Sequence, residues 1–117
     1  MIIIDYQSRT PIYEQIINEI EKYVSLGILK PKEQILSIRE MASTLGINPN
    51  TVKKAYSELE NRGVIQTFST KGTFISENVD KIKSNNIETK INDIKGIIKE
   101  LEKLGITKDE IIKRIKE

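Results

Sequence analysis

The chain has 117 residues, enough for one domain or for one small domain with an appendage. It contains no cysteine and no histidine, which excludes disulfides, most zinc sites and catalysis by a Ser–His or Cys–His pair. Its 19 Lys and Arg against 17 Asp and Glu give a net charge of only +2, so the chain lacks the global basic excess typical of nucleic-acid-binding domains.

Signals for export or membrane insertion are missing from the sequence. Residues 1–5 have no basic segment, and their apolar run is too short for a signal peptide. No apolar run approaches the ~20 residues that a membrane helix needs. We therefore expect a cytoplasmic protein without membrane contact. No residues are spaced as a catalytic, cofactor or metal site, so we expect neither a cofactor nor an enzyme.

The first predicted helix covers about residues 11–26. Thr10 is a suitable N-cap, and Pro11 suits the first helical position. Apolar residues then recur at helical spacing, which predicts one buried face, and Gly27 marks the end of the helix. The apolar residues are Ile12, Ile16, Ile20 and Val24, with Ile17 and Tyr23 widening the stripe.

The second predicted helix covers about residues 37–45. Ser37 and Glu40 have the spacing of a capping box, and Leu36 and Met41 have that of a hydrophobic staple. Gly46 follows, where a left-handed backbone conformation ends a helix at little cost. The start and the end of this helix are therefore both marked in the sequence.

A third helix is predicted to start only three residues later, at Asn48-Pro49, a cap followed by a first-position proline. Its apolar residues recur at i, i+3, i+4 and i+7, so they face inward, and Gly63 closes it. Two short helices joined by a tight turn with glycine form a helix-turn-helix. The inward residues are Val52, Ala55, Tyr56 and Leu59; the outward ones are Asn50, Lys54, Ser57 and Asn61, with Thr51 and Lys53 on the flanks.

Two β-prone runs follow, at residues 64–68 and 73–75, around the polar turn 69–72, and they predict a hairpin. A hairpin directly after the second helix of such a pair is called a wing. The sequence therefore predicts a winged helix-turn-helix domain at residues 1–76, mostly α with a small β hairpin.

Charge within this region is uneven. Residues 36–57 contain a single acid, Glu40, and residues 61–76 contain none. One face of a nearly neutral protein is therefore predicted to be positive. The basic residues in these two ranges are Arg39, Lys53, Lys54, Arg62 and Lys71.

Residues 77–117 are predicted to form two further helices separated by Gly105. The first begins as early as Val79 or after the polar stretch 84–86; both starts remain open. The second has a capping box at Thr107 and Glu110. Apolar residues of the first helix alternate spacings of four and three, as in a coiled coil. We expect residues 77–117 to be a dimerisation segment, with candidate contacts Ile87, Ile91, Ile94, Ile98, Leu101, Ile111, Ile112 and Ile115.

Taken together, these elements resemble the GntR family of bacterial transcription regulators, and the short helical tail resembles its YtrA subfamily. The likeness covers most of residues 3–76. The matching segments are PIYEQI at 11–16, LSIREMA at 36–42, NTVKKAYSELE at 50–60, GVI at 63–65 and KGTFI at 71–75.

The sequence departs from the family pattern at four places. Residues 31–32 are Pro-Lys where the family usually has Pro-Gly, and residues 35–37 are Ile-Leu-Ser where it usually has Leu-Pro-Ser. The segment 48–50 replaces one that commonly carries a serine and an arginine, and Thr70 stands where a second wing glycine is expected. These departures affect base specificity and the wing rather than the fold.

The resemblance implies that Arg39 reaches DNA, where guanine is the commonest partner of an arginine, and that Thr51 and Lys53 contact phosphates or bases. Asn50 faces outward with no structural task, which favours an adenine or phosphate contact. Ser37 is a cap whose backbone amide is a candidate phosphate donor. The remaining candidates for DNA contact each have a structural alternative. Asn48 is a candidate base contact or only a helix cap, and Lys54 is a candidate contact or part of a solvated face. Thr70, Lys71 and Gly72 would approach the minor groove or the DNA backbone, or they form an ordinary polar turn.

The predicted function is a sequence-specific, DNA-binding transcription regulator, a homodimeric repressor on an inverted-repeat operator. The alternative is a winged-helix protein-interaction module without DNA affinity, which would more typically expose apolar residues on the third helix. Typical ligand pockets measure ~300–1,000 Å³, and a tail of about forty residues can hardly enclose one within a single subunit. The sequence does not identify an effector ligand, and a small site at a dimer interface stays open as an alternative.

Overall fold

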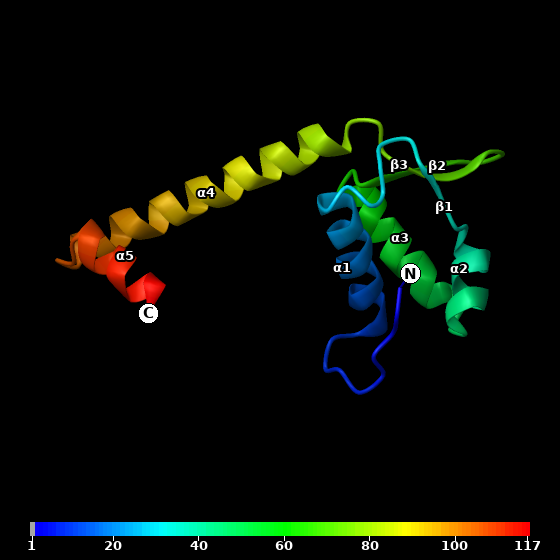
Figure 1. The fold of residues 1–117 in the computed structure, drawn as a ribbon, viewed down its shortest axis with the longest axis horizontal. Helices are drawn as coiled ribbons and strands as arrows, with labels where there is room; N and C mark the ends of the chain where they lie inside the picture. The colour runs from blue at the N-terminus through cyan, green and yellow to red at the C-terminus, as the bar shows by residue number, and fades with distance from the viewer. Residues whose placement is uncertain (1) are drawn as a thin grey trace. The chain divides into compact units, whose positions relative to one another are not determined.

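The computed structural model describes residues 2–117, and its elements match the expected order with one addition. Figure 1 shows them along the chain. The helices are α1 (Ile12–Ser25), α2 (Ile38–Leu45), α3 (Pro49–Asn61), α4 (Val79–Lys103) and α5 (Lys108–Lys116), and the strands are β1 (Gln34–Ile35), β2 (Ile65–Phe68) and β3 (Gly72–Ile75). The expected fold class, a winged helix-turn-helix followed by two helices, is confirmed.

The start of α1 differs from the prediction. Pro11, not Thr10, is the N-cap residue, and no side chain caps the helix. Gln15 organises this end instead: its Nε2 donates to the carbonyl oxygens of Asp5 and Thr10, both at 2.9 Å, and its Oε1 accepts from the Asp5 amide. The residues before α1 are therefore fastened by a side chain one turn inside the helix.

The corner between α2 and α3 follows the local signals in the sequence. Ser37 and Glu40 form the reciprocal capping box. Gly46 has φ 66°, in the left-handed region, and ends α2. Asn48 then caps α3 by accepting a hydrogen bond from the Asn50 amide at 2.8 Å, with Pro49 as the first helical residue.

The core lies between these three helices and the inner face of the sheet. In Figure 1, α1 and α3 run side by side, and α2 packs on α3. Tyr56 is 2% exposed, as the helical spacing predicted, and its hydroxyl donates to the Leu36 carbonyl at 2.7 Å. Burial raises the pKa of this hydroxyl well above its ordinary value. The fully buried side chains include Ile16, Ile17, Ile20, Val52, Leu59, Ile65 and Ile75.

The sheet has three antiparallel strands in the order β1-β3-β2. The hairpin of β2 and β3 was predicted, with Ile65 opposite Ile75 and Phe68 opposite Gly72. The two-residue strand β1 was not predicted, and it pairs Gln34 with Phe74. It places the segment before α2 on the edge of the wing.

Lys32, just before β1, has φ 69°, the only positive value at a non-glycine position among residues 2–117. Its amide donates to the Ile75 carbonyl at 2.9 Å, which holds the turn against β3. A left-handed conformation costs an ordinary L-residue about 1 kcal/mol or more. This explains why the family pattern has glycine at this place.

Contacts divide the chain into a unit that ends at Ile82 and a unit of Lys83–Glu117. The first turn of α4 belongs to the first unit, because Val79 is 2% exposed in the same core. α4 is continuous through residues 84–86 and through Gly96, so the earlier of its two predicted starts is correct. No helix among the described residues is long and apolar enough to span a membrane.

Candidate nucleic-acid interface

The side-chain carboxylate of Glu40 takes part in the capping box at the start of α2. Oε1 of Glu40 accepts from the Ser37 amide at 3.0 Å, and the Ser37 hydroxyl accepts from the Glu40 amide at 3.1 Å. The hydrogen bond from the Ser37 amide lowers the pKa of Glu40. The only acid of this segment is therefore engaged in the capping box, beside the positive end of the helix dipole.

Arg39, in the first turn of α2, is exposed and has no ion-pair partner among residues 2–117. The same holds for Lys53 in the second turn of α3 and for Lys71 in the turn between β2 and β3. Three of the predicted DNA contacts are therefore exposed cations without an ion-pair partner, which is what a phosphate-binding surface requires.

The outward side of α3 is polar. Asn50 is exposed at its first turn, and Thr51 beside it is half-buried. Asn48 serves as the cap of this helix, which confirms its structural role and leaves the predicted base contact as a proposal. No large apolar side chain of α3 is exposed.

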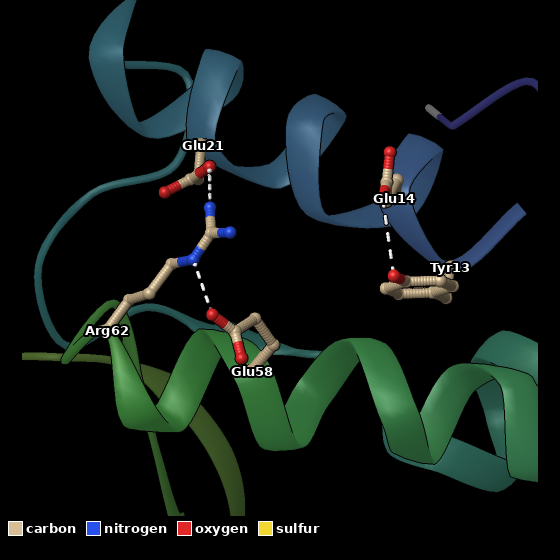
Figure 2. A network of polar contacts seen from close by, with 5 residues as sticks. All are labelled: Tyr13, Glu14, Glu21, Glu58 and Arg62. Atoms are coloured by element: carbon tan, nitrogen blue, oxygen red, sulfur yellow. Dashed lines mark hydrogen bonds and ion pairs between the residues drawn. The ribbon is translucent and has the colours of Figure 1, made fainter. Parts of the chain in front are cut away.

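Lys54 lies on the flank of this surface that faces α1. Its Nζ is 3.9 Å from the ring centroid of Tyr13, a cation–π contact. The Tyr13 hydroxyl in turn donates to Oε1 of Glu14 at 3.2 Å (Figure 2). This hydrogen bond raises the pKa of Tyr13. Lys54 is thus exposed, as predicted, but it is held by an aromatic ring rather than simply solvated.

Arg62 does not add to the positive face. Its Nε donates to Oε1 of Glu58 at 2.9 Å, and its Nη1 donates to Oε1 of Glu21 at 2.8 Å. Figure 2 shows the guanidinium between the two carboxylates, joining the end of α3 to α1. Hydrogen bonding to Glu58 raises the pKa of Arg62. Of the basic residues counted in residues 36–57 and 61–76, Arg62 is therefore the one whose charge is paired with carboxylates.

The turn of the wing carries Thr70 and Lys71, both exposed, followed by Gly72 at φ 117°. Nε2 of Gln34, in β1, donates to the Lys71 carbonyl at 3.2 Å. A Cβ on Gly72 would lie 2.6 Å from the same Nε2. Gly72 therefore has two reasons to be glycine: its backbone angle and the close approach of Gln34.

Two residues of this surface, Gln34 and Tyr13, had no role in the sequence-based prediction. Gln34 precedes α2 by four residues but acts on the wing 37 residues later. Tyr13 belongs to the family motif at 11–16, which gave a signal for its presence but not for its contact with Lys54.

In the second unit, the candidate dimerisation residues differ in exposure. Ile94 is 49% exposed, whereas Ile98 and Leu101 are half-buried. Ile111 is only 4% exposed and lines a small pocket with Leu101, so it packs within the tail and presents no surface to a partner. The exposed members are Ile87, Ile91, Ile94, Ile112 and Ile115, joined by Ile97 and Leu104.

The family model described as "Bacterial regulatory proteins, gntR family" matches residues 12–75. The chain is 48% identical over 101 residues to the HTH-type transcriptional repressor YtrA of Bacillus subtilis, covering 86% of this chain and 75% of that protein.

Solved structures give the same result. A transcriptional regulator from Oenococcus oeni matches 97% of this chain and 94% of its own, with 37% identity and a TM-score of 0.70. YtrA from Sulfolobus acidocaldarius, a GntR-family transcription factor, matches 98% of this chain and 93% of its own, with 38% identity and a TM-score of 0.63. The DNA-binding domain of AraR in complex with operator ORX1 matches 63% of this chain and 92% of its own, with 25% identity and a TM-score of 0.56.

Proposed function

We propose, from the premise that this chain belongs to the gntR family of bacterial regulatory proteins, that it binds operator DNA and represses transcription as a homodimer. Its relatives are named as transcription regulators, and the AraR domain has been solved with an operator. The proposed site of action is the cytoplasm, where a bacterial regulator meets chromosomal DNA. The operator is an inverted repeat, matching the two-fold symmetry of a dimer.

One observation carries this proposal: Arg39, Lys53 and Lys71 are exposed without ion-pair partners among residues 2–117, although the protein as a whole is nearly neutral. The four ion pairs of this part of the chain all lie elsewhere. A surface that keeps its cations unpaired is suited to phosphates, which release counterions on contact.

Each element has a distinct task in this proposal. Arg39 at the start of α2 and Asn50 at the start of α3 reach base edges in the major groove, where arginine pairs with guanine and asparagine with adenine. Lys53 and Thr51 contact phosphates. In the wing, Lys71 contacts the backbone or the minor groove, together with Thr70 and Gly72.

The N-terminal ends of α2 and α3 offer backbone hydrogen-bond donors. The Ser37 and Asn48 side chains satisfy backbone amides at the starts of α2 and α3, and the amides left over at each start point toward an approaching anion. Lys54 takes part through its ammonium, which lies on the ring of Tyr13 in the first turn of α1.

Dimerisation is assigned to the tail. α4 and α5 leave apolar side chains exposed at helical spacing, including Ile87, Ile91 and Ile94. Burying such a stripe on a second copy returns about 25 cal/mol per Å² of apolar surface removed from water. A symmetric dimer presents two copies of α3 to two half-sites.

The rival interaction module is disfavoured by α3. A helix that docks on a protein partner exposes an apolar or aromatic anchor. Among residues 49–61 every large apolar side chain faces the core instead.

The test is a fluorescence-anisotropy titration of operator DNA at two salt concentrations. Binding of the intact protein should weaken steeply with salt, because each phosphate contact contributes about 0.9 to the log–log slope. Lys53→Ala should weaken binding and flatten the slope by roughly one unit per contacting lysine. Lys22→Ala, an exposed lysine at the end of α1, is the matched control and should change neither.

A slope near zero for the intact protein would exclude the proposed electrostatic surface. Equal effects of Lys53→Ala and Lys22→Ala would show that net charge, rather than the face of α3, determines affinity.

A further inference from the structure

An apolar pocket of about 450 Å³ lies within the first unit, on the side of α2 that does not carry Arg39. It is lined by the second half of α1, the segment after it, β1, α2 and Ile2. Its volume falls within the ~300–1,000 Å³ typical of small-molecule sites. Nothing in the proposed DNA contacts uses it.

Three of the side chains that line this pocket are buried. Ile2, Ile20 and Met41 line it and are 8%, 2% and 7% exposed. Its rim is different: Ile28 and Leu36 line the same pocket while remaining 58% and 39% exposed. Exposing these apolar side chains to water is unfavourable in free energy. A bound molecule that covered them would make that free energy favourable to binding.

The chemistry of the lining selects the occupant. None of the lining residues is charged, and the polar ones are Tyr23, Gln34 and Thr44. An ion placed here would lose its hydration without gaining a counter-charge. We infer that this pocket binds a small, uncharged, largely hydrocarbon molecule with one or two hydrogen-bonding groups.

Two of the lining residues are also part of the hydrogen-bonding that shapes the DNA face. Nε2 of Gln34 donates to the Lys71 carbonyl in the wing turn, and the Leu36 carbonyl accepts from Tyr56 of α3. An occupant in contact with Gln34 competes with the bond that holds the wing. Occupancy should therefore weaken DNA binding, and DNA should weaken occupancy by the same factor. This coupling rests on the proposed function, whereas the binding site does not.

The site is tested on the full-length, ¹⁵N-labelled protein without DNA, by NMR titration with 2-naphthol and with 1-octanol as uncharged probes. The amides of Ile28, Leu36 and Thr44 should shift and saturate at one probe per chain. Naphthalene-2-sulfonate has the same ring system with a negative charge, and it should bind about tenfold more weakly or worse.

A matched pair of variants locates the probe. Ile28→Trp places a large side chain at the mouth of the pocket and should weaken 2-naphthol binding about tenfold. Leu26→Trp adds the same side chain at an exposed position two residues away that does not line the pocket, and it should leave binding unchanged. Thermal unfolding of both variants verifies that they remain folded.

Several results would overturn the site. They are the absence of saturable shifts at about 1 mM of either uncharged probe, shifts confined to residues 83–117, and equal weakening by the two tryptophan variants. Pocket shifts that depend on protein concentration without any probe would also overturn it, because a second copy of the chain would then be the occupant.

The coupling has a separate readout. Saturating 2-naphthol should weaken operator binding by about fivefold or more, within the usual range of coupling between sites. Unchanged or tighter operator binding at saturation overturns the coupling and leaves the site in place. Failure to bind any DNA in the absence of the probe would instead count against the proposed function, which the NMR titration does not involve.

Discussion

Nη1 of Arg62, the residue that ends α3, donates to Oε1 of Glu21 in α1 at 2.8 Å, and so joins two elements 41 residues apart. Nε of the same side chain donates to Glu58 within α3. This pairing directs the side chain of a basic residue of the first unit toward α1.

Arg62→Ala should lower the free energy of unfolding modestly, because all three side chains are between 36% and 43% exposed. A double-mutant cycle with Glu21→Gln should give a coupling of about 0.2–1 kcal/mol that shrinks with salt. The measurement is urea unfolding. Operator affinity at fixed salt should stay near that of the unaltered protein; a loss as large as that of Lys53→Ala would show that Arg62 contacts DNA.

Arg39→Ala should damage specificity more than general affinity. A bidentate contact with guanine provides about 1–3 kcal/mol of discrimination at one base pair. The measurement compares operator DNA with random DNA of equal length, and the mutant should lose affinity mainly for the operator. If both affinities fell equally, Arg39 would contact a phosphate.

Ile94→Asp should dissociate the proposed dimer. Ile94 is 49% exposed on α4, so the substitution leaves the subunit's own core intact while it places a charge in the apolar stripe. Asn92→Asp, an exposed neighbour on the same helix, adds the same charge and is the control. Light scattering should show a monomer only for Ile94→Asp, with weaker operator binding. An unaltered protein that is monomeric at tens of micromolar, yet binds its operator tightly, would contradict the assignment.

Lys32→Gly should stabilise the protein. Lys32 has φ 69°, and glycine adopts that conformation without the side-chain penalty, which is about 1 kcal/mol or more. Two losses reduce the gain to roughly 0.5–1 kcal/mol: the extra freedom of glycine in the unfolded chain and the exposed Lys32–Glu77 ion pair, worth little at the surface.

The unfolding free energy of Lys32→Gly is best compared with that of Lys30→Gly, two residues earlier, where φ is not positive. Lys30→Gly should be neutral or destabilising. Equal effects at the two positions would show that the backbone at Lys32 carries no strain.

Glu40 should make stability depend on pH in the acidic range. Its pKa is lowered from the ordinary 4.5 by the hydrogen bond from the Ser37 amide. Because the folded-state pKa is depressed, its contribution is present above pH 4.5 and is lost as pH falls through the lowered value. The stability difference between the unaltered protein and Glu40→Gln should therefore shrink below pH 4.5. A difference that grows on acidification would contradict the capping role.

The sequence by itself determined the helices and their boundaries at the corner of the DNA-binding unit. Ser37 with Glu40, Gly46, and Asn48 with Pro49 each act on backbone groups within four residues of themselves. Such signals are complete in a short window of sequence, and the structure reproduces them. At the start of α1 the short-range signal failed, because Gln15 replaced the expected Thr10 cap by reaching back to Asp5 and Thr10.

Only the tertiary structure decided which cations stay free. The i,i+4 spacing of Glu58 and Arg62 is visible in the sequence, but it does not show that Arg62 also pairs with Glu21 or that Lys54 lies on the ring of Tyr13. Both partners come from α1, 41 residues away in each case. Spacing along one helix predicts the face on which a side chain lies but not what another helix places opposite it.

The same reason applies to β1 and to the wing. A two-residue strand has no periodicity to detect, and Gln34–Ile35 becomes a strand only because β3, about forty residues later, supplies its hydrogen-bonding partners. That pairing brings the side-chain amide of Gln34 to the Lys71 carbonyl, and the apolar pocket lies beside α2. Hydrogen bonds and cavities between distant segments exist only after the chain has folded. Patterns within a short stretch of sequence therefore do not predict them.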